Sequence, residues 1–223
     1  MNLATARTET PMASRNLQPT PIVCVVDDDV SVRESLEALV LSMGLRVETY
    51  ERAEDFLGRS PIACPACLIL DVALPELNGL ELQDRMASDG QLMPIIFITG
   101  FGDVPMSVKA MKAGAFEFLT KPLVDEVLVD AIKGAIEASR NARALDAERR
   151  EIRACYDSLT RREREVMELV VAGRLNKQIG AEIGISEITV KAHRGQVMRK
   201  MRVRSLADLV KAATRLKGDP SGG

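Results

Sequence analysis

Apolar positions from residue 21 onward alternate between short uninterrupted runs and stripes at helical spacing. Residues 22–26 and 67–70 are apolar runs of the kind found in strands that are buried on both faces. Residues 30–43 repeat apolar positions every three or four residues, a helical pattern that Gly44 ends. The alternation continues, with strands expected at 45–50, 94–98 and 116–119, and helices at 53–57, 80–87, 104–113 and from about 124. Five such repeats predict an α/β fold with a doubly wound, five-stranded parallel sheet of flavodoxin-like order.

Polar residues close four of these five strands. Asp27 and Asp28 follow the first, Asp71 ends the third, Thr99 the fourth and Lys121 the fifth. Because the carboxyl ends of parallel strands share one edge, we expect these side chains to meet there. Three neighbouring carboxylates repel one another unless a cation lies among them, and oxygen ligands suit Mg²⁺. The Lys121 ammonium and the Thr99 hydroxyl suit phosphoryl oxygens. Asp71 is then left as a nucleophile that would form an aspartyl phosphate.

Each of these residues also has a simpler interpretation. Asp28 or Asp29 could cap the helix that follows. Asp71 and Thr99 could be ordinary turn residues, and Lys121 a solvated lysine in a loop. The set at the strand ends is more specific than any one of its members, so we favour the shared site.

The second half of the chain has only helical patterns. Residues 124–155 contain no proline, which predicts an extended helix with a charged linker at 141–156. Ala138, Leu145 and Ile152 recur every seven residues, but only one face repeats, so a stable coiled coil is not expected. A short dimerising contact is the alternative.

From Thr160 the pattern predicts a small all-α domain. Thr160 and Glu163 form a capping-box signature, and helices are expected at 160–172, 176–183, 187–201 and 206–216. Two short helices around a Gly-containing turn, followed by a basic helix, are typical of a helix-turn-helix. The alternative is a solvated basic surface. The residues predicted to bind DNA are Asn176, Lys177, Thr189, Lys191, His193, Arg194, Arg199 and Lys200.

Charge supports a division into two domains with different partners. Residues 21–140 carry 20 acidic and 10 basic side chains, whereas residues 156–223 carry 8 and 14. The basic part is therefore a candidate for binding nucleic acid. The four cysteines are scattered and the only histidine is His193, which argues against a disulfide scaffold or a zinc site. No apolar run reaches 18 residues and no signal core begins the chain, so we expect a cytoplasmic protein without a membrane partner.

Residues 21–140 resemble the receiver domain of two-component response regulators. The matching motifs are 26–29 (VDDD), 71–79 (DVALPELNG), 99–100 (TG) and 121–122 (KP). The resemblance implies that Asp71 is the phospho-acceptor and that Asp27, Asp28, Asp71 and the Ala73 carbonyl hold Mg²⁺. It also implies that Thr99 and Lys121 sense the phosphoryl group, that Phe118 is an aromatic switch, and that the bond between Lys121 and Pro122 is cis. Residues 99–114 are similar to the FixJ subgroup, which places Val108 and Lys112 on a dimer face.

Residues 157–217 resemble the LuxR/NarL-type DNA-binding domain, through 159–166 (LTRREREV), 173–179 (GRLNKQI), 189–194 (TVKAHR) and 198–201 (MRKM). The predicted organisation is a flexible tail at 1–20, a receiver at 21–140, a linker helix at 141–156 and this output domain. The chain is thus identified as a member of the FixJ/NarL response regulators. That family implies phosphorylation by a sensor histidine kinase, homodimerisation, binding to double-stranded promoter DNA, contact with RNA polymerase and regulation, expected to be activation, of transcription.

Two other functions stay open on the residues alone. An aspartate-nucleophile phosphohydrolase would have an acid at position 73, where this chain has alanine. A DNA-binding protein whose receiver is never phosphorylated would not need all five strand-end residues. We therefore expect a regulator and not an enzyme.

Overall fold

The computed structural model describes residues 19–91, 93–100 and 104–217. The chain divides into two compact units, residues 1–140 and 141–223. Most of the tail expected at 1–20 lies outside the described residues.

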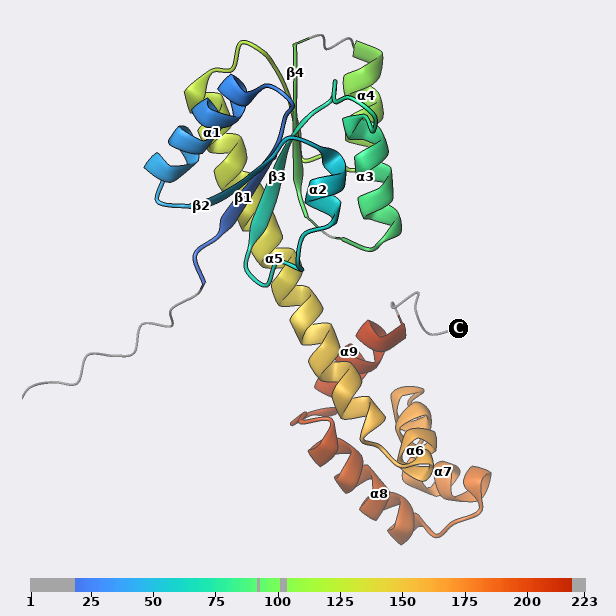
Figure 1. The fold of residues 1–223 in the computed structure, drawn as a ribbon. Helices are drawn as coiled ribbons and strands as arrows, with labels where there is room; N and C mark the ends of the chain where they lie inside the picture. Colours follow the sequence, from blue (N-terminus) through green and yellow to red (C-terminus); the bar gives the residue numbers. More distant parts are fainter. Residues whose placement is uncertain (1–18, 92, 101–103, 218–223) are drawn as a thin grey trace, which may run out of the picture. The chain divides into compact units, whose positions relative to one another are not determined.

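The N-terminal unit contains one five-stranded parallel sheet, which confirms the predicted fold class (Figure 1). The strand order is β2-β1-β3-β4-β5, so β1 and β3 are neighbours. The strands are β1 (Ile22–Val26), β2 (Arg46–Tyr50), β3 (Ala66–Asp71), β4 (Ile95–Thr99) and β5 (Glu117–Thr120). Val26 pairs with Leu70, and Asp71 pairs with Ile98. This register brings the carboxyl ends of β1, β3 and β4 to one edge.

Helices cover both faces of the sheet, because successive strand side chains point to opposite sides. Val23 and Val25 of β1 pack toward α1 and α5, whereas Cys24 and Val26 pack toward α2, α3 and α4. In Figure 1 the two helix layers lie on either side of the strands. The helices are α1 (Val30–Ser42), α2 (Ala53–Leu57), α3 (Gly79–Ser88), α4 (Val104–Lys112) and α5 (Asp125–Asp157).

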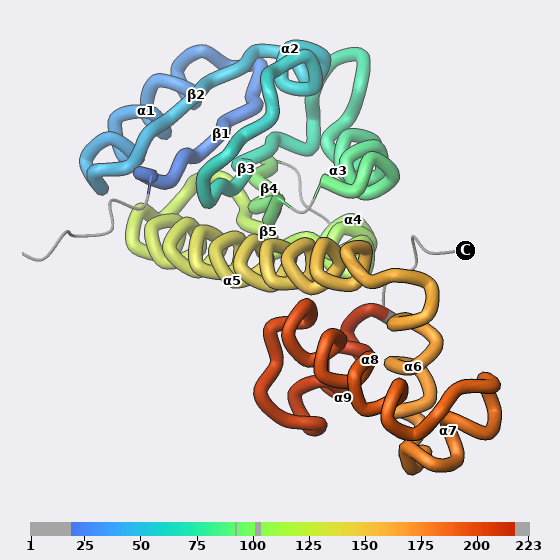
Figure 2. The backbone as a smooth tube through the Cα atoms, turned by 90° about the horizontal axis from the view of Figure 1, so that it is seen from below, coloured from blue at the N-terminus to red at the C-terminus, as the bar shows by residue number. Residues whose placement is uncertain are grey.

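Helix α5 is a single helix of 33 residues (Figure 2). Its first part belongs to the N-terminal unit, where Leu128 and Ile132 are buried against the sheet and Ser139 Oγ accepts a hydrogen bond of 3.0 Å from the Ala66 N–H. Its last part belongs to the C-terminal unit, where Ile152 packs against that unit's core. Between them Leu145 is 58% exposed. The seven-residue repeat is therefore not one continuous buried stripe.

The C-terminal unit is all-helical and is completed by α6 (Arg161–Val171), α7 (Asn176–Ile183), α8 (Glu187–Lys200) and α9 (Leu206–Lys217). Thr160 and Glu163 form the predicted capping box. Gly184 ends α7 with φ of 72°, a conformation that favours glycine. A Cβ on Gly180 would lie 2.7 Å from a backbone carbonyl oxygen of the turn, so the two helices of the motif approach closely. Among the described residues, no helix combines the length and apolar character needed to cross a membrane.

Candidate functional site

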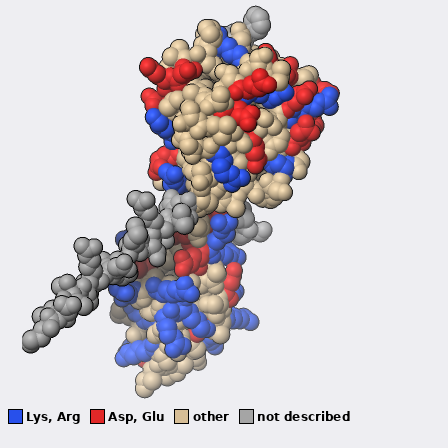
Figure 3. Space-filling view, turned by 60° about the vertical axis from the view of Figure 1, so that its left-hand side comes forward, with Lys and Arg blue, Asp and Glu red and all other residues tan. Residues whose placement is uncertain are grey.

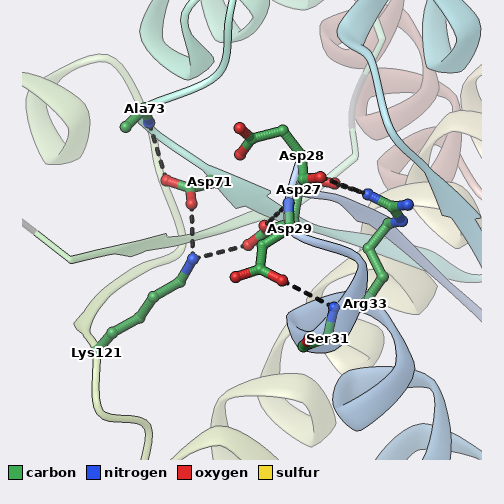
Figure 4. Close-up of polar contacts among 8 residues, drawn as sticks. All are labelled: Asp27, Asp28, Asp29, Ser31, Arg33, Asp71, Ala73 and Lys121. Atoms are coloured by element: carbon green, nitrogen blue, oxygen red, sulfur yellow. Dashed lines mark hydrogen bonds and ion pairs between the residues drawn. The ribbon is translucent and has the colours of Figure 1, made fainter.

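Three carboxylates from two neighbouring strands meet at the edge of the sheet (Figure 4). Asp27 and Asp28 follow β1, and Asp71 is the last residue of β3. One oxygen of each lies within 4.8 Å of the others. Asp27 is fully buried and Asp71 is 5% exposed, whereas Asp28 is open to solvent. The cluster that the strand order predicted is therefore present.

Lys121 lies between two of these carboxylates. Its Nζ is 2.8 Å from Asp27 Oδ2 and 2.7 Å from Asp71 Oδ2. Burial alone would lower the pKa of this ammonium, but the two carboxylate hydrogen bonds outweigh burial and raise the pKa. Burial raises the pKa of Asp27, opposed by the contact with Lys121. The site thus holds a protonated lysine against a desolvated acid.

The structure separates the two roles that Asp28 and Asp29 could have had. Asp29 is the N-cap of α1, and its Oδ1 accepts a hydrogen bond of 2.8 Å from Ser31 N–H. Asp28 makes no cap and keeps its side chain in the carboxylate cluster.

Arg33 is a positioning residue that the sequence patterns did not single out. Its guanidinium Nη1 donates to the carbonyl oxygens of Asp27 at 2.7 Å and of Asp28 at 3.0 Å. This clamp fixes the backbone of the loop after β1 from the first turn of α1. An arginine seven residues beyond a strand end carries no recognisable signal by itself.

The loop after β3 holds Asp71 closely. Asp71 Oδ1 accepts a hydrogen bond of 2.8 Å from Ala73 N–H. A Cβ on Gly79 would lie only 2.5 Å from the backbone oxygen of Asp71, so this position needs glycine. The bond between Lys121 and Pro122 is cis, as predicted.

The predicted switch residues lie beside the site. Thr99, 1% exposed, ends β4, and its carbonyl oxygen accepts a hydrogen bond of 2.8 Å from Lys121 N–H. Phe118 in β5 is half-buried on the α4 side of the sheet, with its ring centroid 6.1 Å from that of Phe97.

The residues predicted for a dimer face lie on α4. Val108 is 44% exposed and Lys112 is also exposed. Val104 and Met111 on the same helix add exposed apolar surface, at 76% and 45%.

The donor set determines which ligand the acidic edge can hold. Carboxylate oxygens without a thiol or imidazole suit a hard divalent cation such as Mg²⁺. A bound cation would offset the repulsion among the acids. The residues therefore fit Mg²⁺.

Basic side chains gather on the C-terminal unit (Figure 3). On α8, Lys191 is paired with Glu187 at 3.1 Å and Arg194 donates to Asn176 Oδ1 at 3.2 Å, so α7 and α8 are linked. Of the other residues predicted to bind DNA, those with exposed side chains are Lys177, Thr189 and Arg199, and His193 is half-buried.

Lys200, which was also predicted to bind DNA, has a polar contact within the unit. Its Nζ donates to Glu163 Oε2 at 2.6 Å and to the Ser158 carbonyl at 3.2 Å. Glu163 is buried, and the hydrogen bond from Lys200 is the main cause of its lowered pKa. The Lys200 side chain is therefore engaged inside the unit, and its contact with DNA stays a prediction.

Comparison with known proteins identifies both units. Residues 23–133 match the response regulator receiver domain, and residues 157–213 match the luxR family of bacterial regulatory proteins. TmoT, a response regulator protein of Ectopseudomonas mendocina, is 47% identical over 197 residues, covering 88% of this chain and 89% of that protein. The chain belongs to the response regulator family. It is a two-component response regulator with a receiver domain and a LuxR-type DNA-binding domain.

Other relatives cover both domains of this response regulator. Nodulation protein W of Bradyrhizobium diazoefficiens is 47% identical over 87% of this chain and 86% of its own. A solved structure of the response regulator StyR is 44% identical, with a TM-score of 0.79 over 88% of this chain and all of that one. Full-length FixJ from B. japonicum is 40% identical, with a TM-score of 0.52 over 89% and 98%.

Proposed function

We propose that Asp71 accepts a phosphoryl group from a sensor histidine kinase and that the acyl phosphate switches DNA binding. One observation carries this proposal. A nearly buried carboxylate lies at a strand end with Lys121 Nζ at 2.7 Å and two further carboxylates beside it. Asp27, Asp28, Asp71 and the Ala73 carbonyl would hold Mg²⁺.

The chemistry follows from these positions. Bound Mg²⁺ would supply charge neutralisation for the transferring group. An Asp71 carboxylate oxygen forms the new bond to phosphorus, while the bond between phosphorus and the kinase histidine nitrogen breaks. Lys121 exchanges a carboxylate partner for a phosphoryl oxygen, and the Thr99 hydroxyl donates to another. Storage of the group is favoured over turnover, because position 73 supplies no acid–base side chain.

The stored group would act through a two-state equilibrium. A Thr99 shift toward the phosphoryl oxygen opens room for Phe118, which is only half-buried in this structure. The α4 surface around Val108 and Lys112 then forms a homodimer face, which its exposed apolar side chains support.

Dimerisation would bring two output domains onto one two-fold site in promoter DNA. Helix α8 would enter the major groove, and activation of transcription would follow through RNA polymerase. The proposed DNA-binding residues are Asn176, Lys177, Thr189, Lys191, His193, Arg194 and Arg199.

The test compares acetyl phosphate plus Mg²⁺ with Mg²⁺ alone, measuring phosphorylation by intact mass, association by sedimentation velocity and binding to promoter DNA. Wild type should gain one phosphoryl group, dimerise and bind DNA more tightly, whereas Asp71→Asn should do none of these. Asp29→Asn is the matched control: it removes a neighbouring acid but keeps a good N-cap, so it should behave as wild type. Equal DNA affinity of wild type and Asp71→Asn would favour a phosphorylation-independent regulator. Continuous phosphate release would favour the phosphohydrolase.

A further inference from the structure

Helix α8 exposes a hydrocarbon side chain at its amino-terminal end. Ile188, its second residue, is 80% exposed, the largest fraction among the exposed large hydrophobic side chains described. It belongs to no hydrophobic cluster of the described residues. A β-branched residue is not a preferred helix former, so the helix itself gains little from it. A partner that covers this side chain would remove its hydrocarbon surface from water.

Ile188 lies on the helix face opposite the core. Val190 and Val197 are buried, and a rotation of 100° per residue places positions 188, 192, 195 and 199 on the other side. Those residues are Ile188, Ala192, Gly195 and Arg199. The first three offer no hydrogen-bonding side chain. This face is apolar at its amino-terminal end and becomes basic only near its carboxyl end.

The polar neighbours of Ile188 are already partnered. The Thr189 hydroxyl is 2.8 Å from the hydroxyl of the N-cap Ser186, and Lys191 is paired with Glu187. Ile188 is thus an exposed side chain of the first turn that can form no hydrogen bond itself. In a helix-turn-helix, the amino-terminal residues of the second helix contact base edges in the major groove. The apolar group exposed on base edges in that groove is the thymine C5-methyl.

We propose that Ile188 is a specificity-determining residue that packs on a thymine C5-methyl group in each half-site. The inference rests on the proposed DNA-binding function and deepens it. The surrounding basic side chains supply sequence-independent attraction to phosphates. Ile188 adds a preference for thymine at one position, by excluding water from two hydrocarbon groups.

The experiment uses full-length protein with acetyl phosphate and Mg²⁺, and a duplex selected from a randomised library by that protein. Each thymine is replaced in turn by deoxyuridine, which removes only the methyl group. A single replacement, at one equivalent position in either half-site, should weaken binding about fourfold, the factor for burying one methyl group. Ile188→Ala should bind the thymine duplex more weakly and lose the difference between thymine and deoxyuridine, whereas Ile188→Val should retain it.

Leu41→Ala is the matched control, because Leu41 is an exposed hydrophobic residue of α1, at 55%. It should keep the wild-type dependence on the methyl group. Unchanged thermal unfolding of Ile188→Ala would show that the fold is intact.

Three results would overturn the inference. Deoxyuridine could leave wild-type binding unchanged at every thymine of a specifically bound site. Ile188→Ala could keep the full penalty for deoxyuridine, or could weaken every sequence equally, as expected for a side chain that lies against the backbone or a protein partner. In all these cases specific binding survives, and the proposed function stands. Failure to select any duplex would overturn both proposals.

Discussion

Replacing Lys200 by methionine tests whether this residue stabilises the output domain or contacts DNA. The change keeps most of the hydrocarbon stem and removes the charge. Glu163, 5% exposed, would lose its 2.6 Å partner but keep the hydrogen bond of 2.7 Å from Thr160 N–H. Breaking a buried pair from one side costs about 3–5 kcal/mol. Because the Lys200 side chain is 29% exposed and the cap contact remains, we expect about 1–3 kcal/mol.

The assay is native-state hydrogen exchange of the amides in residues 161–171, which reports the opening free energy of α6 within the intact chain. Lys191→Met is the matched control on the same helix. Its pair with Glu187 is exposed at both ends and four residues apart, so its loss should cost under about 0.5 kcal/mol. The two variants should have the reverse ranking in their effects on DNA binding. Lys191→Met should lower the salt dependence of affinity by about one ion, whereas Lys200→Met should leave it unchanged.

Acid should reduce the difference between wild type and Lys200→Met. The hydrogen bond from Lys200 lowers the pKa of Glu163 in the folded state, so its stabilisation is present above the unfolded pKa. It is lost as the pH falls through the folded pKa. If Lys200→Met instead kept wild-type exchange rates and reduced the salt dependence of DNA binding, Lys200 would be a phosphate contact and not a stabilising partner of Glu163.

Three further outcomes are expected. Gly79→Ala should reduce the rate of Asp71 phosphorylation by acetyl phosphate and cost about 1–3 kcal/mol in urea unfolding, because the new Cβ meets the Asp71 backbone oxygen; a wild-type rate would contradict this. Gly180→Ala should destabilise the output domain by a similar amount, whereas Gly195→Ala, with no neighbouring atom within 4 Å, should raise its thermal midpoint; equal effects would argue against the close turn. Mg²⁺ affinity, measured by fluorescence or calorimetric titration, should begin to fall with acid at a higher pH than for an ordinary carboxylate. Burial raises the pKa of Asp27, so a proton competes with the metal there at a higher pH. An onset at or below the usual carboxylate range would contradict this.

Much of the receiver site could be predicted because its residues stand at strand ends. An uninterrupted apolar run predicts a buried strand, and the parallel order brings the next polar residue of each strand to one edge. Asp27, Asp71, Thr99 and Lys121 all follow from that rule, and the structure brings them together. Arg33 does not follow from it, because its contacts are to backbone carbonyls and any long basic side chain in the first helical turn has the same pattern.

In the output domain, helical periodicity predicts the direction of some side chains but not of all. Helical periodicity places Val190 and Val197 on one face of α8, and both are buried. Periodicity does not predict that Lys200 pairs with Glu163, since a long side chain near the edge of a helix face can reach inward or outward.

By itself, the sequence determined the α/β order, the acidic strand ends and the basic helix-turn-helix, because these depend on residue type and on regular spacing. Tertiary structure alone decided that Asp29 caps a helix while Asp28 joins the cluster, that Lys200 turns toward Glu163, and that Ile188 stays exposed. Each of those outcomes depends on which atoms from distant parts of the chain come within hydrogen-bonding or packing distance. Periodicity along a single helix or strand carries no information about such partners.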